Sequence, residues 1–270
     1  MRLSEHVWVY RGAGNIGIVR DGTNALLMDC GDGRVRAALS AAGVTTIERI
    51  LFTHGHRDQA CGVPSLLADG ARTCVPAKER AVFEAVNEYW NDPKNRWHLY
   101  RCDPNSVQAD PIRVDPTCAD GDELHFGAAR IRVLDTPGHT DGSVSFVVEA
   151  DDKRVIFCGD VLYGHGQLGD AWSLQKGVMT RDYHGFLGAR EKSVASLQRV
   201  KSQRAHLLVP SHGPVVNRPD ETVETLITRL ARCYDKYVAT SALRHYFPEL
   251  FADDAGRELP RFKEAIVVVQ

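Results

Sequence analysis

The sequence lacks any apolar run that approaches the roughly 20 residues needed to cross a bilayer. Its opening segment, MRLSEHVWVYRG, contains no apolar core of a signal peptide. It also lacks a long block of charge of one sign, and its formal net charge is -2. A balanced charge gives no electrostatic footprint for nucleic acid or for an anionic membrane surface. We therefore expect the partner to be a small-molecule substrate, with no nucleic acid and no membrane.

The sequence also lacks the CxxC spacing that marks many zinc and redox sites. Its seven cysteines are odd in number and scattered along the chain. They are Cys30, Cys61, Cys74, Cys102, Cys118, Cys158 and Cys233. This pattern is typical of free thiols in a reducing compartment, so we expect a cytoplasmic protein.

Internal repeats and low-complexity stretches are absent as well. Apolar residues make up 43% and charged residues 25% of the 270 residues, which is the usual balance of a globular protein. We expect one main domain over residues 1–240. Residues 241–270 form a C-terminal extension that either packs on this domain or marks the truncation of a longer chain.

Short runs of β-branched and apolar residues alternate with turn residues, and other segments have helical spacing. The expected strands are 6–12, 15–22, 24–31, 47–54 and 72–77, with hairpins at 123–139 and 142–160 and a strand and turn at 205–213. The expected helices are 34–43, 63–70, 78–90, 186–203 and 218–243. Residues 91–119 lack periodicity and are interpreted as a long excursion. This order predicts two packed sheets with helices outside.

Polar residues that can bind a metal gather directly after one expected strand. His54 and His56 are two positions apart, and in a strand-like segment such residues point to the same side. The two imidazoles can therefore hold one ion. Asp58 and Gln59 lie in the following turn and are free to face another way.

Three further strands end at a polar residue beside small turn residues. These residues are His139, Asp160 and His212. Taken singly, each histidine could be a surface residue, and Asp160 could form an Asx-turn. Taken together with the histidine pair, they predict a metal centre at one edge of the sheets, with ligands that suit zinc and its neighbours.

The fragments THGHRDQ, TPGHT, FCGD and PSHG, in this order, resemble the metallo-β-lactamase-fold superfamily, whose usual signature is HxHxDH followed by H, D and H. The resemblance implies an α+β fold, a four-layer αβ/βα sandwich of two mixed β-sheets with helices outside. It also implies two metal sites. The implied ligands are His54, His56 and His139 for the first ion, Asp58, Gln59 and His212 for the second, and Asp160 as the bridge between them.

Gln59 departs from this signature, because the family usually has histidine there. An amide oxygen is a harder and weaker ligand than an imidazole nitrogen. We therefore expect one or two Zn²⁺ ions, with a second site that binds zinc less tightly, prefers manganese or iron, or stays empty. Alternatively, Gln59 points away and bonds to the backbone.

The implied chemistry is hydrolysis by a metal-bound hydroxide, because a metal ion lowers the pKa of its water to about 7. Asp58 is the expected catalytic residue that orients this water and accepts its proton. The expected substrate is a small ester, thioester or lactone. Two alternatives remain: a single-iron oxygenase similar to persulfide dioxygenases, and a metal-bearing domain without turnover.

Aromatic residues after Asp160 and in the excursion are candidates for the substrate pocket. Trp172, Tyr183 and His184 form the expected substrate wall, although Trp172 could equally pack its loop down. The aromatic residues near 87–100 could cover the pocket, fasten the excursion to the core or form a homodimer contact.

Overall fold

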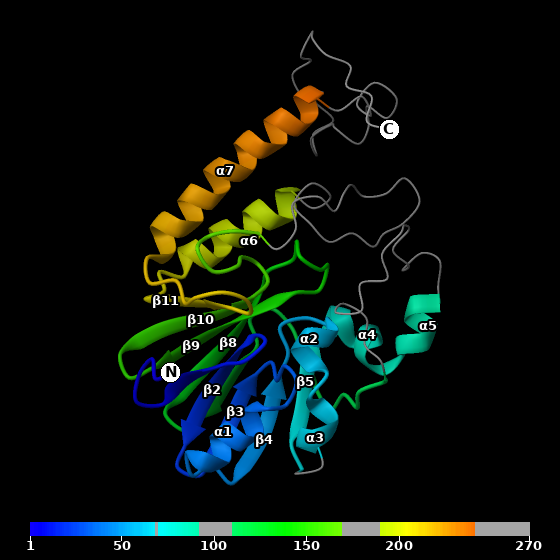
Figure 1. Ribbon diagram of the computed structural model, residues 1–270, viewed down its shortest axis with the longest axis vertical. Helices are drawn as coiled ribbons and strands as arrows, with labels where there is room; N and C mark the ends of the chain where they lie inside the picture. Colours follow the sequence, from blue (N-terminus) through cyan, green and yellow to red (C-terminus); the bar gives the residue numbers. More distant parts are fainter. Residues whose placement is uncertain (68–69, 92–109, 169–189, 241–270) are drawn as a thin grey trace.

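The computed structural model describes residues 1–67, 70–91, 110–168 and 190–240. Two β-sheets pack against each other, and helices cover the outer face of each sheet (Figure 1). The four-layer sandwich of two mixed sheets predicted from the sequence is confirmed. No helix in these described ranges is both long and apolar enough to span a membrane.

The first sheet has six strands in the order β1-β2-β3-β4-β5-β6. Antiparallel pairing joins β1, β2 and β3, whereas β3, β4, β5 and β6 are parallel. The strands are β1 (Val7–Arg11), β2 (Asn15–Asp21), β3 (Asn24–Met28), β4 (Thr46–Leu51), β5 (Arg72–Pro76) and β6 (Thr117–Cys118). Its helices are α1 (Val35–Ala41), α2 (Arg57–Ala60), α3 (Val63–Leu67), the 3₁₀ turn η1 (Ala77–Glu79), α4 (Arg80–Glu84) and α5 (Val86–Asn91).

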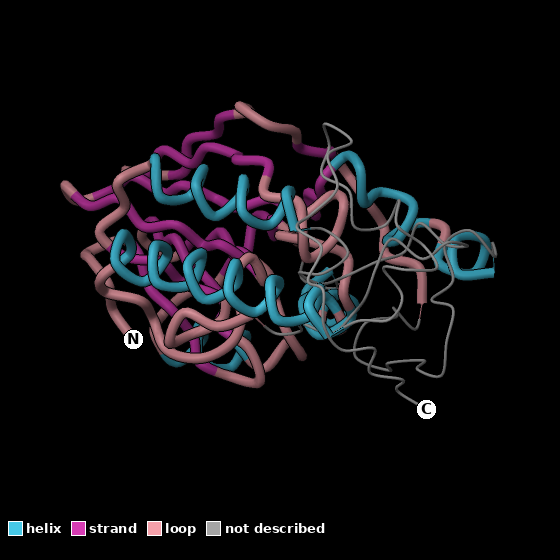
Figure 2. The backbone as a smooth tube through the Cα atoms, turned by 90° about the horizontal axis from the view of Figure 1, so that it is seen from above, coloured by secondary structure: helices cyan, strands magenta, loops and turns pink. Residues whose placement is uncertain are grey.

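The second sheet has five strands in the order β11-β10-β9-β8-β7. The strands are β7 (Glu123–Phe126), β8 (Ala129–Asp135), β9 (Val144–Ala150), β10 (Lys153–Gly159) and β11 (Leu207–Pro210). Helices α6 (Arg190–Ser202) and α7 (Pro219–Thr240) lie side by side over its outer face (Figure 2). Because β7 to β10 are joined by antiparallel pairs and β10 pairs with β11 in parallel, β8, β10 and β11 all run in the same direction.

Three apolar cores separate the four layers. Alternate residues of one strand enter different cores: Leu27 packs toward the first group of helices, whereas Leu26 and Met28 pack between the sheets. The same alternation in β9 sends Val147 toward α6 and α7 and Phe146 between the sheets. Burial of each such side chain contributes about 1.5–3 kcal/mol. Both faces of the central strands are therefore apolar, which explains their continuous hydrophobic runs.

One predicted helix, 78–90, is wrong as a single element. It is divided into η1, α4 and α5, and Ala85 leaves the helical region with φ -119 and ψ 49. The backbone N–H of Ile112 donates to the carbonyl of Phe83 at 2.8 Å. In a continuous helix, the N–H of Asn87 would donate to this carbonyl. A tertiary contact thus replaces a local one.

The excursion and the histidine pair also differ from the prediction. In its described part, residues 110–119, the excursion contains the short strand β6, which extends the first sheet. Residues 92–109 lie outside the described residues. β4 ends at Leu51, so His54 and His56 lie in the loop before α2 and not in a strand. The C-terminal extension predicted at 241–270 lies outside the described residues.

Candidate metal centre

The strand ends place the candidate ligands at one edge of the sandwich. β8, β10 and β11 run in the same direction, so the residues that follow them, His139, Asp160 and His212, leave the second sheet on one side. The loop after β4 reaches this side as well, because the backbone N–H of Val144 donates to the carbonyl of Thr53 at 2.9 Å. Ligand-bearing loops on rigid strands can hold a precise geometry.

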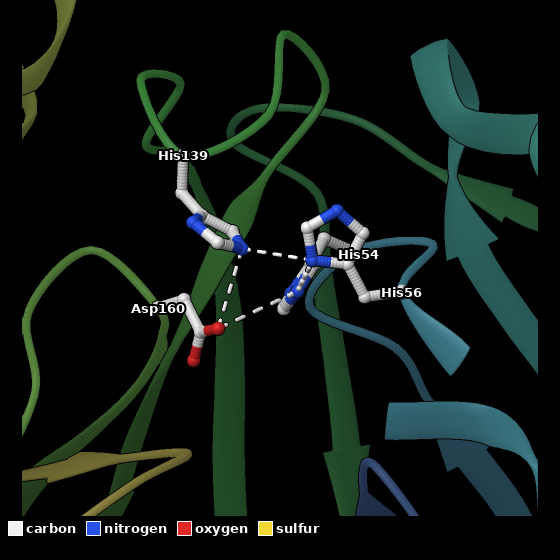
Figure 3. A group of neighbouring side chains, drawn as sticks. All are labelled: His54, His56, His139 and Asp160. Carbon is white, nitrogen blue, oxygen red and sulfur yellow. Dashed lines mark hydrogen bonds and ion pairs between the residues drawn. The ribbon is translucent and has the colours of Figure 1, made fainter. Parts of the chain in front are cut away.

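Four of the predicted ligands, His54, His56, His139 and Asp160, converge on one point (Figure 3). Nδ1 of His56 lies 3.1 Å from Nε2 of His54 and 2.9 Å from Nε2 of His139. Oδ2 of Asp160 lies 3.2 Å from Nε2 of His139 and 3.8 Å from Nε2 of His54. One donor atom from each of the four residues lies within 4.8 Å of all the others.

His54 is oriented by a buried chain of polar groups. Its Nδ1 lies 3.0 Å from Oγ1 of Thr53, and that hydroxyl lies 2.9 Å from Oδ2 of Asp29. Burial raises the pKa of Asp29 to about 8, although hydrogen bonds from Thr53 oppose the shift. When Asp29 is ionised, it accepts from the hydroxyl, which then accepts from Nδ1–H of His54. This tautomer leaves the lone pair of Nε2 facing the cluster, as metal ligation requires.

Two of the remaining predicted ligands, Asp58 and His212, form a second, more exposed pair. Nε2 of His212 lies 3.0 Å from Oδ2 of Asp58 and 3.8 Å from Oδ2 of Asp160. The hydrogen bond to Asp58 raises the pKa of His212. The loop of His212 is fixed by the buried Asn15, whose Nδ2 donates to the carbonyls of Pro210 at 2.8 Å and Gly213 at 2.7 Å. Asp160 thus lies between the two groups, where the sequence predicted a bridging residue.

Gln59 lies in α2 and is buried. Its backbone carbonyl accepts hydrogen bonds from the N–H groups of Cys30 at 2.9 Å and Gly31 at 3.0 Å. Its side-chain Nε2 is buried and has no hydrogen-bond partner among the described residues. Ligation by Gln59 therefore stays a prediction.

Tyr163 is a site residue that the sequence reasoning missed. Its hydroxyl donates to Oδ2 of Asp160 at 3.1 Å, and its ring lies against His212 with centroids 4.8 Å apart. The only local signal is its position three residues after Asp160. Burial raises the pKa of Asp160 to about 7, and the charge of His212 opposes this rise. The predicted substrate residues Trp172, Tyr183 and His184 lie outside the described residues.

The residues fit a divalent metal ion. Three imidazole nitrogens and one carboxylate oxygen are the donor types that zinc and its neighbours prefer. Oδ1 of Asp160 is buried without a hydrogen-bond partner in the described part of the chain, and such an atom is costly unless a ligand or cation satisfies it. The predicted Asp58 and His212 stand next to this donor set through Asp160.

Comparison with known proteins agrees with this architecture. A family model described as the metallo-beta-lactamase superfamily matches residues 9–212. An atrochrysone carboxyl ACP thioesterase from Aspergillus fumigatus is 27% identical over 223 residues, which cover 81% of this chain and 56% of that protein. A hydroxyacylglutathione hydrolase from Shewanella sp. is 28% identical over 162 residues, which cover 60% of this chain and 49% of that protein. The chain thus spans about half the length of these curated relatives.

Solved structures share the fold at low sequence identity. A metallo-β-lactamase from Cronobacter sakazakii with a HARLDQ motif has a TM-score of 0.65 at 19% identity and covers 88% of this chain and 97% of its own. The BJP-1 metallo-β-lactamase of Bradyrhizobium japonicum has a TM-score of 0.64 at 20% identity, over 88% of this chain and 93% of its own. At such identities the likeness shows the fold alone. The HARLDQ motif of the first protein ends in Asp-Gln, and residues 58–59 of this chain are also Asp-Gln.

Proposed function

The chain belongs to the metallo-β-lactamase superfamily, and from this premise we propose that it is a metal-dependent hydrolase that cleaves small thioesters. The observation that carries the proposal is the convergence of His54, His56, His139 and Asp160, with the pair Asp58 and His212 beside it. A hydrolase needs an activated water next to an electrophilic site, and this donor set can supply both through a metal ion.

The first ion would be held by His54, His56, His139 and Asp160, and a second by Asp58, His212, Asp160 and Gln59. Zinc suits the nitrogen-rich first set best, whereas the oxygen-rich second set also suits manganese or iron. When bound, the metal lowers the pKa of a water molecule and polarises the substrate carbonyl. Glutamine at position 59, where the family usually has histidine, would weaken the second set, so the first site would fill before the second.

Asp58 is the residue to which we assign the role of proton acceptor. Its Oδ2 lies 3.0 Å from Nε2 of His212, and its side chain is 31% exposed, so substrate and water can reach it. We assign its other oxygen, Oδ1, to accept the proton of the attacking water. General-base catalysis requires the accepting oxygen to lie within hydrogen-bond distance of the water in the reactive geometry.

Tyr163 would keep Asp160 in place by donating to Oδ2. Its ring lies against His212, with centroids 4.8 Å apart, so Tyr163 contacts both groups of predicted ligands. Tyr163 therefore has a positioning function, because its single O–H donor holds the orientation of Asp160.

Thioesters are favoured over the esters and lactones also expected from the sequence. The names of two relatives refer to thioester cleavage, one on an acyl carrier protein and one on a glutathione derivative. A thiol has a pKa near 8.5, so it leaves as a thiolate with little help from an acid. A site that supplies an activated water and a charge-stabilising group therefore suffices for a thioester.

A substrate panel tests the proposal. Protein purified without added metal is analysed for zinc, iron and manganese and then offered an acyl-pantetheine thioester, a hydroxyacyl-glutathione thioester, a matched oxygen ester, a lactone and a glutathione persulfide. We expect thiol release from the thioesters by the zinc-loaded protein. Iron content with oxygen uptake on the persulfide would instead support the oxygenase. Full metal content without turnover of either thioester would contradict the proposed activity.

A further inference from the structure

Glu79 is a buried carboxylate outside all four motif fragments. It ends η1, three residues after β5, and only 5% of it is exposed. From the described residues its carboxylate accepts three hydrogen bonds: Oε2 from the backbone N–H of Gly55 at 3.1 Å, and Oε1 from the hydroxyl of Thr140 at 2.6 Å and from the backbone N–H of Gly142 at 3.0 Å. The donors belong to two separate loops.

These two loops carry the three histidines of the metal centre. Gly55 lies between His54 and His56, and Thr140 directly follows His139. One carboxylate therefore connects the loop that presents two imidazoles with the loop that presents the third. Since each oxygen bonds a different loop, a shift of either loop breaks at least one of the three hydrogen bonds.

The surroundings are shaped for this side chain. A Cβ atom on Gly55 would lie 2.9 Å from Oε2 of Glu79, and a Cβ atom on Gly142 would lie 2.5 Å from its Cγ. Real Cβ atoms essentially never approach other atoms that closely. The two glycines thus leave the space that Glu79 fills, one in each ligand loop.

We propose that Glu79 is a positioning residue of the metal centre, which sets the distance between the His54–His56 pair and His139 by bonding Gly55 on one side and Thr140 and Gly142 on the other. The inference rests on the proposed metal site. Groups outside the ligand set that orient ligands typically change metal affinity by about 10- to 100-fold when they are removed. A loop that is free to move would spread the imidazoles and lower the affinity in this way.

The substitution Glu79→Gln tests the carboxylate with little change in shape. An amide has one oxygen acceptor, whereas Glu79 uses both of its oxygens, so the new NH₂ group must face either the N–H of Gly55 or the N–H of Gly142. The matched control is Glu84→Gln, because Glu84 lies five residues later on α4, is 34% exposed and pairs with Arg80 at the surface. The control makes the same chemical change away from the ligand loops.

The readout is titration of metal-free protein with Co²⁺, followed by visible absorption, together with thermal unfolding of the metal-free forms. We expect Glu79→Gln to weaken Co²⁺ binding at least tenfold and to change the visible spectrum at temperatures where the protein is folded. Glu84→Gln is expected to match the wild type. A purely structural role of Glu79 would lower the unfolding temperature and leave affinity and spectrum unchanged below it.

Thr140→Val provides a second, milder variant in case Glu79→Gln does not fold. It removes one hydroxyl donor to Glu79 and keeps the shape of the side chain, so we expect a weaker loss of Co²⁺ affinity in the same direction. The inference is overturned if a folded Glu79→Gln variant has the Co²⁺ affinity and spectrum of the wild type. If Glu79→Gln does not fold, the same result in Thr140→Val overturns it. Failure of the wild type to bind Co²⁺ would overturn the metal site itself, and the two failures are therefore distinguishable.

Discussion

Nε2 of His139 lies 2.9 Å from Nδ1 of His56, although the two residues are 83 positions apart in the sequence. Two neutral ring nitrogens that face each other with lone pairs repel, and a proton or a cation between them removes the repulsion. Asp160 brings a carboxylate oxygen to 3.2 Å from the same Nε2 of His139. The relationship is the one expected of ligands that share an ion.

Asp58→Asn is expected to retain the fold and the first metal ion but to reduce kcat severely. The amide keeps the shape and the contact with His212, yet it cannot accept the proton of the attacking water. We expect a loss of more than tenfold, which corresponds to about 1.4 kcal/mol in the barrier. Steady-state kinetics on a thioester, with metal content measured in parallel, checks this. A variant that keeps more than about a tenth of the rate would show that Asp58 is not the proton acceptor.

Gln59→His is expected to strengthen the second metal site, because an imidazole is a better ligand for zinc than an amide. His212 and Asp160 remain in place in this variant. Calorimetric titration of metal-free protein with zinc measures the second binding event. If the variant binds the second ion no more tightly than the wild type does, Gln59 is not part of the ligand set.

Tyr163→Phe is expected to keep the fold and to lower kcat about tenfold or more, because it removes the hydrogen bond that orients Asp160. The hydroxyl that donates to Oδ2 of Asp160 is the only group removed. Tyr10→Phe, on the half-buried strand β1, is the matched control and should behave as the wild type. Equal kcat values for Tyr163→Phe and the wild type would remove the residue from the mechanism.

The fold was largely predictable because strand alternation and strand ends are local properties of the sequence. The four motif fragments predicted where His139, Asp160 and His212 lie, since each follows an apolar strand. The same local reasoning put His54 and His56 in a strand, whereas they meet through a loop held by Thr53 and Asp29.

Long-range contacts were not predictable from local patterns. Glu79 looks like an ordinary helix residue in the sequence, and only the folded chain brings it against Gly55 and Gly142. The break at Ala85 has a similar origin, because Ile112 bonds the carbonyl of Phe83 from a distant segment.

The metal-free protein is expected to lose stability as the pH rises from about 4 to about 7. Burial raises the pKa of Asp160 from 3.8 to about 7. The folded state therefore binds a proton that the unfolded chain has released in this window, so the free energy of unfolding falls as pH increases, by a few kcal/mol in order of magnitude. His212, whose pKa is also raised, acts in the same direction between its ordinary value and its folded value.

Urea unfolding of chelator-treated protein at several pH values measures this effect. Asp160→Asn, which cannot titrate, is the control and should show a flatter dependence on pH. Identical pH dependence in the wild type and in Asp160→Asn would contradict a buried, protonated Asp160 in the metal-free state.

The most direct test of the central claim is the metal content of His54→Ala and His139→Ala, determined by elemental analysis beside the wild type and His125→Ala. His125 lies exposed on β7 and controls for the loss of an imidazole as such. Each of the first two variants loses one of the four converging donors, so we expect both to lose most of the bound metal and all hydrolysis, while His125→Ala retains both. Unchanged metal stoichiometry in His54→Ala and His139→Ala would contradict the assignment of this cluster as the metal centre.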